Sequence, residues 1–317
     1  LSNFFTFNLS ILHLLPFIPM LRRDFIKISG TTLASAPLVS VPVRFNSAPK
    51  LNIKKSLKYS MVDAPGSVLD HFRMLKEIGF DGVEMDSPSD INIDEVLEAK
   101  EETGLEIPGV INSAHWKMPL SDPDASVRAK CVEASKTALQ DCKRYGGTTM
   151  LLVPGVVNDK ISYTDAYRRS QEEIQKLLPV AEETGVKIAI ENVWNNMLIS
   201  PLEAARFIDE FENPMIGWYF DVGNIVRYGW PEHWIEALGD RIMKLDIKEY
   251  SRKKQQDEGI WKGFDVELME GDCNWQEVNK ALDKIGYEGW ASAEVKGGGR
   301  ERLQFISQKM DAIFGLA

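Results

Sequence analysis

The chain has 317 residues, of which 44% are hydrophobic and 26% charged, and its formal net charge at pH 7 is −10. This composition is typical of a globular protein that can bury a sizeable core, and it excludes disordered, collagen-like and coiled-coil classes. The negative charge argues against a broad nucleic-acid-binding surface, and three widely spaced cysteines with no CxxC pair exclude a disulfide framework or a zinc knuckle.

The first 49 residues have the features of a leader. Residues 1–19 are uncharged and begin with leucine, so we interpret them as upstream read-through and Met20 as the start. From Met20 the chain continues L-R-R-D-F-I-K into a mildly apolar run, and 20–49 resembles a twin-arginine export signal carried by Arg22 and Arg23. We therefore expect an exported, periplasmic protein with no stable membrane span after processing and one catalytic domain over 50–317.

Beyond the leader, short apolar runs alternate with amphipathic helical stretches. The expected strands are Leu57–Val62, Gly82–Met85, Glu106–Ile111, Thr148–Val153, Lys187–Glu191, Ile216–Asp221, Ile242–Ile247 and Gly289–Val295. The expected helices are Val68–Ile78, Ile93–Thr103, Ala125–Tyr145, Tyr163–Thr184, one opening at Ser200-Pro201, Glu232–Leu238, Trp275–Ile285 and Arg300–Phe314. Eight units of roughly 30 residues predict an α/β fold, a (β/α)8 TIM barrel. An open doubly wound sheet is the alternative, but no GxGxxG motif follows the first strand.

Carboxylates recur where the expected strands end. Glu191 and Asp221 end the fifth and sixth strands, Asp246 lies on the seventh, and Glu294 on the eighth. Because the strand ends of such a barrel meet at one mouth, these four side chains should converge. Without a cation they would raise one another's pKa values, so we predict one divalent metal ion. Oxygen ligands favour Mn²⁺ or Mg²⁺, with Co²⁺ or Zn²⁺ possible.

Other residues near the strand ends are candidates for substrate contact. They are Glu84, His115, Trp116, Asn224 and Lys248. His115 and Trp116 would form a sugar-facing wall, and Lys248 would neutralise a developing oxyanion. Plainer alternatives are a capping or exposed carboxylate for Glu84, a structural loop histidine for His115, and a salt bridge from Lys248 to Glu249 or Asp221.

In this order, the motifs G-F-D-G-V-E, I-E-N, F-D-V-G, D-I-K-E and S-A-E-V resemble the xylose isomerase-like barrel superfamily, in particular its sugar epimerase and hexulose-phosphate isomerase branch. The resemblance covers about 50–317. It implies that Glu191 and Glu294 form a catalytic acid/base pair and also bind the metal together with Asp221. Two positions depart from the family pattern, because Asp246 and Asn224 stand where relatives often carry histidine.

The resemblance implies a metal-dependent sugar isomerase or epimerase that removes a proton beside the carbonyl of a keto-sugar through an enediolate. The expected partner is a small carbohydrate, unphosphorylated because sugar phosphates are cytoplasmic, and a homo-oligomer is left open. The alternatives are a keto-glycoside lyase or hydrolase with the same metal site, and a catalytically decayed periplasmic sugar-binding barrel. An apurinic endonuclease is disfavoured, because it needs a histidine-rich zinc site and a basic face, whereas the chain has four histidines and is acidic.

Overall fold

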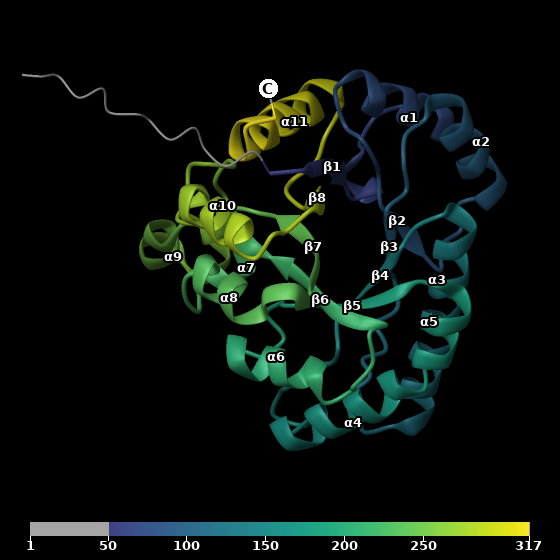
Figure 1. Ribbon diagram of the computed structural model, residues 1–317, viewed down its shortest axis with the longest axis vertical. Helices are drawn as coiled ribbons and strands as arrows, with labels where there is room; N and C mark the ends of the chain where they lie inside the picture. The colour runs from purple at the N-terminus through teal and green to yellow at the C-terminus, as the bar shows by residue number, and fades with distance from the viewer. Residues whose placement is uncertain (1–50, 317) are drawn as a thin grey trace, which may run out of the picture. The chain divides into compact units, whose positions relative to one another are not determined.

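A computed structural model describes residues 51–316, in which eight strands alternate with helices. The strands are β1 (Ile53–Leu57), β2 (Met85–Ser87), β3 (Gly109–Asn112), β4 (Thr149–Leu152), β5 (Lys187–Glu191), β6 (Ile216–Asp221), β7 (Ile242–Ile247) and β8 (Gly289–Ala293). They form one sheet in the order β1-β8-β7-β6-β5-β4-β3-β2, and all seven pairings are parallel. Figure 1 shows the strands in a ring with helices outside it, which confirms the (β/α)8 barrel.

The ring closes between β1 and β2 through a short backbone contact. The Glu84 N–H donates to the Leu57 carbonyl at 2.9 Å, and the Tyr59 N–H donates to the Glu84 carbonyl at 2.9 Å. Lys58 and Glu84 are therefore opposite each other in a parallel bridge. This seam places a lysine and a glutamate side by side just beyond the end of β1.

The helices surround the sheet and follow the strands in alternation. They are α1 (Val68–Glu77), α2 (Ile93–Thr103), α3 (Ala125–Tyr145), α4 (Tyr163–Gln175), α5 (Leu178–Thr184), α6 (Pro201–Asp209), α7 (Val222–Val226), α8 (Pro231–Leu238), α9 (Arg252–Glu258), α10 (Trp275–Lys284) and α11 (Arg300–Phe314). Ser67 and Asp70 form a reciprocal capping box at the start of α1, and Gly146 ends α3 with a φ of 78°. These local signals are why several helix bounds are predictable from sequence.

The strands are buried on both faces, as expected of a parallel barrel. Their outward side chains and the inner faces of the helices form one hydrophobic core, to which β6 contributes Ile216, Trp218 and Phe220. A smaller cluster of Leu151, Ala189 and Tyr219 comes from alternate positions of β4, β5 and β6. Leu151 of this cluster also lines the cavity at the barrel mouth.

Several predicted elements differ from the structure. The third strand begins at Gly109 and not at residue 106, and the eighth ends at Ala293 and not at residue 295. The short helices α7 and α9 were not expected. The first strand ends at Leu57 instead of beginning there, and Tyr59–Met61 is a 3-10 turn. The second strand was predicted over 82–85 but runs from Met85 to Ser87. The predicted helix over 163–184 is two helices, α4 and α5. Pro179 explains the break, because it has no N–H to donate and its ring clashes with the carbonyl four residues earlier.

Among residues 51–316, no helix has both the length and the apolar character needed to cross a bilayer. The predicted leader and its twin-arginine motif lie outside the described residues.

Candidate active site

Four carboxylates converge at the carboxyl end of the barrel. Glu191 and Asp221 are the last residues of β5 and β6, Asp246 is in β7, and Glu294 directly follows β8. One oxygen from each lies within 4.8 Å of the others. Asp221 and Asp246 are fully buried and Glu191 is 6% exposed, whereas the Glu294 side chain is 39% exposed. The parallel register brings them together, since Asp221 pairs directly with Asp246 across β6 and β7.

The spacing and chemistry of this cluster fit one divalent cation. Two ligand oxygens about 2.4 Å from an ion, on opposite sides of it, are about 4.8 Å apart. In addition, the buried Oδ2 of Asp246 has no hydrogen-bond donor within the described part of the chain. A buried carboxylate oxygen without a partner is costly, and a cation would supply the missing contact. An all-oxygen donor set favours a hard ion such as Mn²⁺ or Mg²⁺.

Two lysines neutralise part of the cluster. The Nζ of Lys248 lies 2.8 Å from Asp221 Oδ2 and 3.2 Å from Glu294 Oε2. The Nζ of Lys58 lies 2.8 Å from Asp246 Oδ1. Burial lowers the pKa of each lysine, but the neighbouring carboxylates outweigh it and raise both pKa values above the usual range. Both lysines are therefore charged at neutral pH.

Glu84 lies inside the barrel and not at its mouth. Its carboxylate oxygens are 3.0 Å from the Nζ of Lys58 and 3.0 Å from the Nζ of Lys244, and it accepts a hydrogen bond from the Tyr219 hydroxyl at 2.7 Å. Burial raises its pKa, but the two lysines outweigh burial and hold the pKa well below its usual value. A continuous network, Lys244–Glu84–Lys58–Asp246, thus connects the barrel interior to the carboxylate cluster, and a substrate contact of Glu84 stays a prediction.

The surroundings push the pKa values of the two glutamates in opposite directions. Burial raises the pKa of Glu191, and the charges of Glu294 and Asp246 raise it further. Burial also raises the pKa values of Asp221 and Asp246. For Glu294, Lys248 and Lys58 outweigh burial and lower the pKa. In the metal-free protein Glu191 therefore tends to hold a proton and Glu294 to be ionised, which is the separation that acid/base pairs require.

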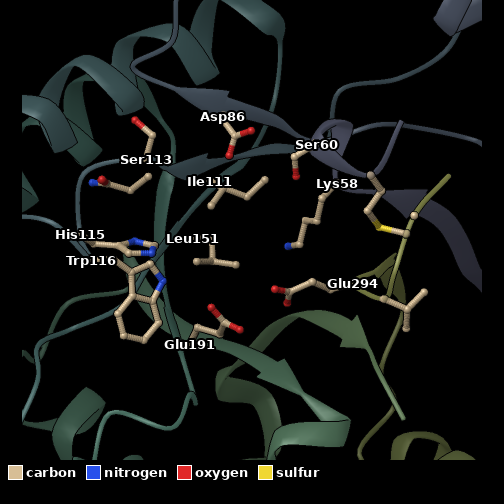
Figure 2. A pocket seen from close by; sticks show the side chains of 14 residues that line it. Lys58, Ser60, Asp86, Ile111, Ser113, His115, Trp116, Leu151, Glu191 and Glu294 are labelled. Carbon is tan, nitrogen blue, oxygen red and sulfur yellow. The ribbon is translucent and has the colours of Figure 1, made fainter. Parts of the chain in front are cut away.

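A cavity of about 500 Å³ opens over the cluster (Figure 2). This volume is within the range of small-molecule sites. Glu191, Glu294 and the amino group of Lys58 face its interior, with His115 and Trp116 along another wall. Its remaining labelled lining residues are Ser60, Asp86, Ile111, Ser113 and Leu151. The cavity therefore combines titratable groups that face its interior with an aromatic wall.

His115 presents a neutral N–H group to the cavity. The Val153 N–H donates to His115 Nδ1 at 3.3 Å, so the proton of the neutral ring is on Nε2. Burial lowers the pKa of His115 to about 4, although Glu294 acts in the opposite direction. Trp116 packs edge-on against the imidazole with 5.7 Å between ring centroids and is 52% exposed. This geometry suits a hydrogen-bond donor beside an aromatic surface; contact with substrate stays a prediction for both residues.

Asn224 and Lys248 hold carboxylates of the cluster in place. The Asn224 N–H donates to Asp221 Oδ1 at 2.8 Å, and its side-chain amide donates to the Asn192 carbonyl at 3.0 Å. Asn192 donates in turn to the Asp221 carbonyl at 2.8 Å. Of the two salt bridges considered from sequence, Lys248 forms the one to Asp221. Glu249 instead accepts from Trp275 Nε1 at 2.8 Å. Substrate contacts of Asn224 and Lys248 stay predictions.

Sequence reasoning missed Lys58, although it lines the cavity and contacts the cluster. The cause is the misplaced first strand: with a strand expected over 57–62, Lys58 did not stand at a strand end. The local sequence gives no period-two signal here, because Lys54, Lys55 and Ser56 stand in a row between Ile53 and Leu57. Asp86, in the short strand β2, is a further lining residue that was not singled out as part of the site.

The chain is similar in sequence and in fold to known proteins. L-ribulose-5-phosphate 3-epimerase from Escherichia coli K12 is 27% identical over 233 residues, which cover 70% of this chain and 79% of the relative. A D-tagatose 3-epimerase-like protein superimposes with a TM-score of 0.71 at 21% identity, covering 83% of this chain and 97% of the other. A 3-keto-D-glucoside 4-epimerase from E. coli superimposes with a TM-score of 0.69 at 18% identity, covering 82% of this chain and 98% of the other. The profile of the xylose isomerase-like TIM barrel matches residues 72–312, and the chain belongs to this family.

Proposed function

We propose that this protein is a divalent-metal-dependent sugar isomerase or epimerase that removes a proton next to the carbonyl of a keto-sugar. The observation that carries the proposal is the convergence of four carboxylates, two of which, Glu191 and Glu294, also line one cavity. The named relatives are sugar epimerases, which supports the reaction class.

The mechanism follows from the positions of the two glutamates. A bound divalent cation would supply Lewis-acid stabilisation of the oxygens that become negatively charged. Glu191 ends β5 and Glu294 follows β8, and these are the first and last of four adjacent strands. The two glutamates therefore approach a bound sugar from different sides. One takes the proton from carbon and the other returns it, and return on the opposite face inverts the centre. Lys58 and Lys248 hold positive charge beside the developing oxyanion.

The remaining residues position the substrate. His115 would donate its Nε2 proton to a sugar oxygen, and Trp116 would pack on the apolar face of the ring. We assign Glu84 to holding Lys58 in place, because both of its oxygens already contact lysines.

A keto-glycoside lyase or hydrolase is the second candidate. It begins with the same proton abstraction and then expels a leaving group. A further cavity on the other side of Glu294 favours it, because that space could hold a leaving group. The similar fold of a 3-keto-D-glucoside 4-epimerase is compatible with this chemistry.

Metal analysis followed by solvent-deuterium exchange tests the proposal. The purified protein should hold about one divalent ion per chain, and in D₂O it should introduce deuterium beside the carbonyl of at least one ketose or keto-glycoside. Glu191→Gln should abolish most of the exchange, whereas Glu98→Gln, at an exposed position of α2, should not. If the protein held no divalent metal and exchanged deuterium into no sugar of the panel, the proposed enzyme would be contradicted. The sugar-binding barrel would then be the remaining alternative.

We also propose that the protein is exported through the twin-arginine route and acts in the periplasm. Support comes from the sequence alone, in the R-R-D-F-I-K run that contains Arg22 and Arg23. Replacing both arginines by lysine should retain the protein in the cytoplasm, measured by cell fractionation. Unchanged export of this variant would contradict the proposal.

A further inference from the structure

We propose that the substrate carries a second, uncharged sugar ring, which binds in a cavity beyond Glu294. The inference rests on the proposed function, because it names the substrate class of the same site. It is carried by the position and the chemistry of this second cavity.

The second cavity has a volume of about 960 Å³ and adjoins the first. Glu294, Val295 and Gly297 line both cavities, so the two meet at one of the proposed catalytic residues. Glu294 is also the most exposed member of the carboxylate cluster. A sugar ring placed between Glu191 and Glu294 would fill the first cavity, and a substituent on its Glu294 side would enter the second.

An aromatic ring forms part of the wall of the second cavity. Phe264 belongs to the segment after β7 and lines the cavity. Its ring centroid lies 4.7 Å from that of Trp194 and 4.8 Å from that of Tyr250, so neighbouring aromatic rings fix its orientation. Aromatic rings in such fixed positions pack well on the C–H faces of sugars at little cost in conformational entropy.

The polar groups around Phe264 favour neutral hydroxyls over a phosphate. Arg302 is paired with Glu267 at 2.6 Å, and Lys254 donates to the Asp265 carbonyl at 2.5 Å. The acidic side chains of Asp265, Glu267 and Glu270 line the same cavity. A phosphate site needs unpaired cations or a run of free backbone N–H groups, and nearby carboxylates repel it. Lys254 and Lys296 line the cavity without a carboxylate partner among the described residues, but five carboxylates face four cations in the lining, so its net charge is negative. Such a lining repels a phosphate and offers donors and acceptors to neutral hydroxyl groups.

The test compares ketoses with and without a second ring. The probes are D-fructose, D-tagatose, the disaccharides lactulose and maltulose, and fructose 6-phosphate, each followed by deuterium incorporation in D₂O. At least one disaccharide should exceed the free ketoses in kcat/KM by about tenfold or more, as expected if the second ring contributes about 1.4 kcal/mol. Phe264→Ala should lower the disaccharide-to-monosaccharide ratio of kcat/KM by about tenfold.

Two further variants keep the result interpretable. Phe264→Leu retains apolar packing against Trp194 and removes only the flat ring, so it should lower the same ratio if Phe264→Ala does not fold. Trp230→Ala is the matched control, because Trp230 is an exposed aromatic residue that lines neither cavity; this variant should leave the ratio unchanged.

The outcomes separate this inference from the proposed function. Equal kcat/KM for ketoses and disaccharides, or a ratio that Phe264 variants do not change, would overturn the second-ring subsite and leave the isomerase in place. A preference for fructose 6-phosphate would overturn it in favour of a phosphate subsite. No exchange with any probe would count against the proposed function and the inference together.

Discussion

Replacing Lys58 by methionine removes the cation that contacts both Glu84 and Asp246. Methionine has a similar length and no charge, so the cavity shape should be largely retained. Glu84 keeps its contacts with Lys244 and Tyr219. Asp246 loses its only cation within the described residues, and we expect the metal-free protein to lose stability as a result.

The structure sets the size of this effect. Where the pH is high enough to ionise Asp246, whose pKa is raised, the Lys58–Asp246 attraction at 2.8 Å is about 6 kcal/mol for an effective dielectric constant of about 20. Desolvation of the two charges offsets part of this, and removing one partner of a buried pair typically costs about 3–5 kcal/mol. For a domain of this size that corresponds to a decrease in Tm of about 10 °C.

The loss should depend on pH. Burial already raises the pKa of Asp246, and without Lys58 its pKa should rise further. A carboxyl group with a raised folded-state pKa contributes stability below its unfolded-state pKa, and this contribution is lost as the pH rises. The deficit of Lys58→Met relative to the unmodified protein should therefore be small near pH 4 and largest near pH 8.

Thermal unfolding after treatment with a chelator measures these effects. Mn²⁺ should restore part of the lost stability, and Lys58→Met/Asp246→Asn should lose less than Lys58→Met because both charges are removed. Lys54→Met is the control, since Lys54 forms an exposed pair with Glu106 that should contribute about 1 kcal/mol or less. If Lys58→Met were as stable as the unmodified protein at pH 8, the energetic role of the network would be refuted.

Three other predictions concern the cluster itself. Glu191→Gln and Glu294→Gln should each lower deuterium exchange by about 10²–10⁴-fold and retain part of the bound metal; near-normal exchange in either variant would remove that residue from the acid/base pair. Metal affinity measured by calorimetry should rise between pH 6 and pH 8. The reason is that raised pKa values leave protons on Glu191, Asp221 and Asp246, and metal binding must displace these protons. A metal affinity that does not change with pH would argue against these pKa shifts. Asp246→Asn should weaken metal binding and Asp246→His should shift preference toward Co²⁺ or Zn²⁺, whereas unchanged affinity in Asp246→Asn would show that Asp246 is not a ligand.

Sequence patterns predicted β5, β6 and β7 correctly because apolar residues dominate these strands, although Lys244 and Asp246 interrupt β7. The bounds of β5, β6 and β7 match the prediction, and each strand ends next to polar residues that mark its limit. The first strand differs because three consecutive polar residues, Lys54, Lys55 and Ser56, separate its two apolar ends. Lys55 is buried, with its Nζ 2.5 Å from Asp311 in α11, and that partner is far away in the sequence. No local pattern can show that such a lysine belongs to a strand.

The same reasoning explains which parts of the site were predictable. Four acids at successive strand ends are visible in the sequence, because each follows its own apolar run, and the parallel register then brings them together. The position of Glu84 depends instead on how β1 and β2 close the ring and on Lys244 from β7. An ion pair between residues of the first and last parts of a barrel leaves no periodic signal.

Charge balance gives a physical reason why an aspartate can stand at position 246, where the resemblance to sugar epimerases leads us to expect a histidine. Four carboxylates with Lys58 and Lys248 leave two negative charges, which one divalent cation neutralises. Glu84 and Lys244 form a further pair with no net charge. A neutral imidazole in place of Asp246 would leave only one negative charge, and the buried centre with its cation would then carry an uncompensated positive charge. The extra negative charge of Asp246 and the positive charge of Lys58 therefore compensate each other. The backbone contact that closes the ring between β1 and β2 places Lys58 close enough to Asp246 for this compensation.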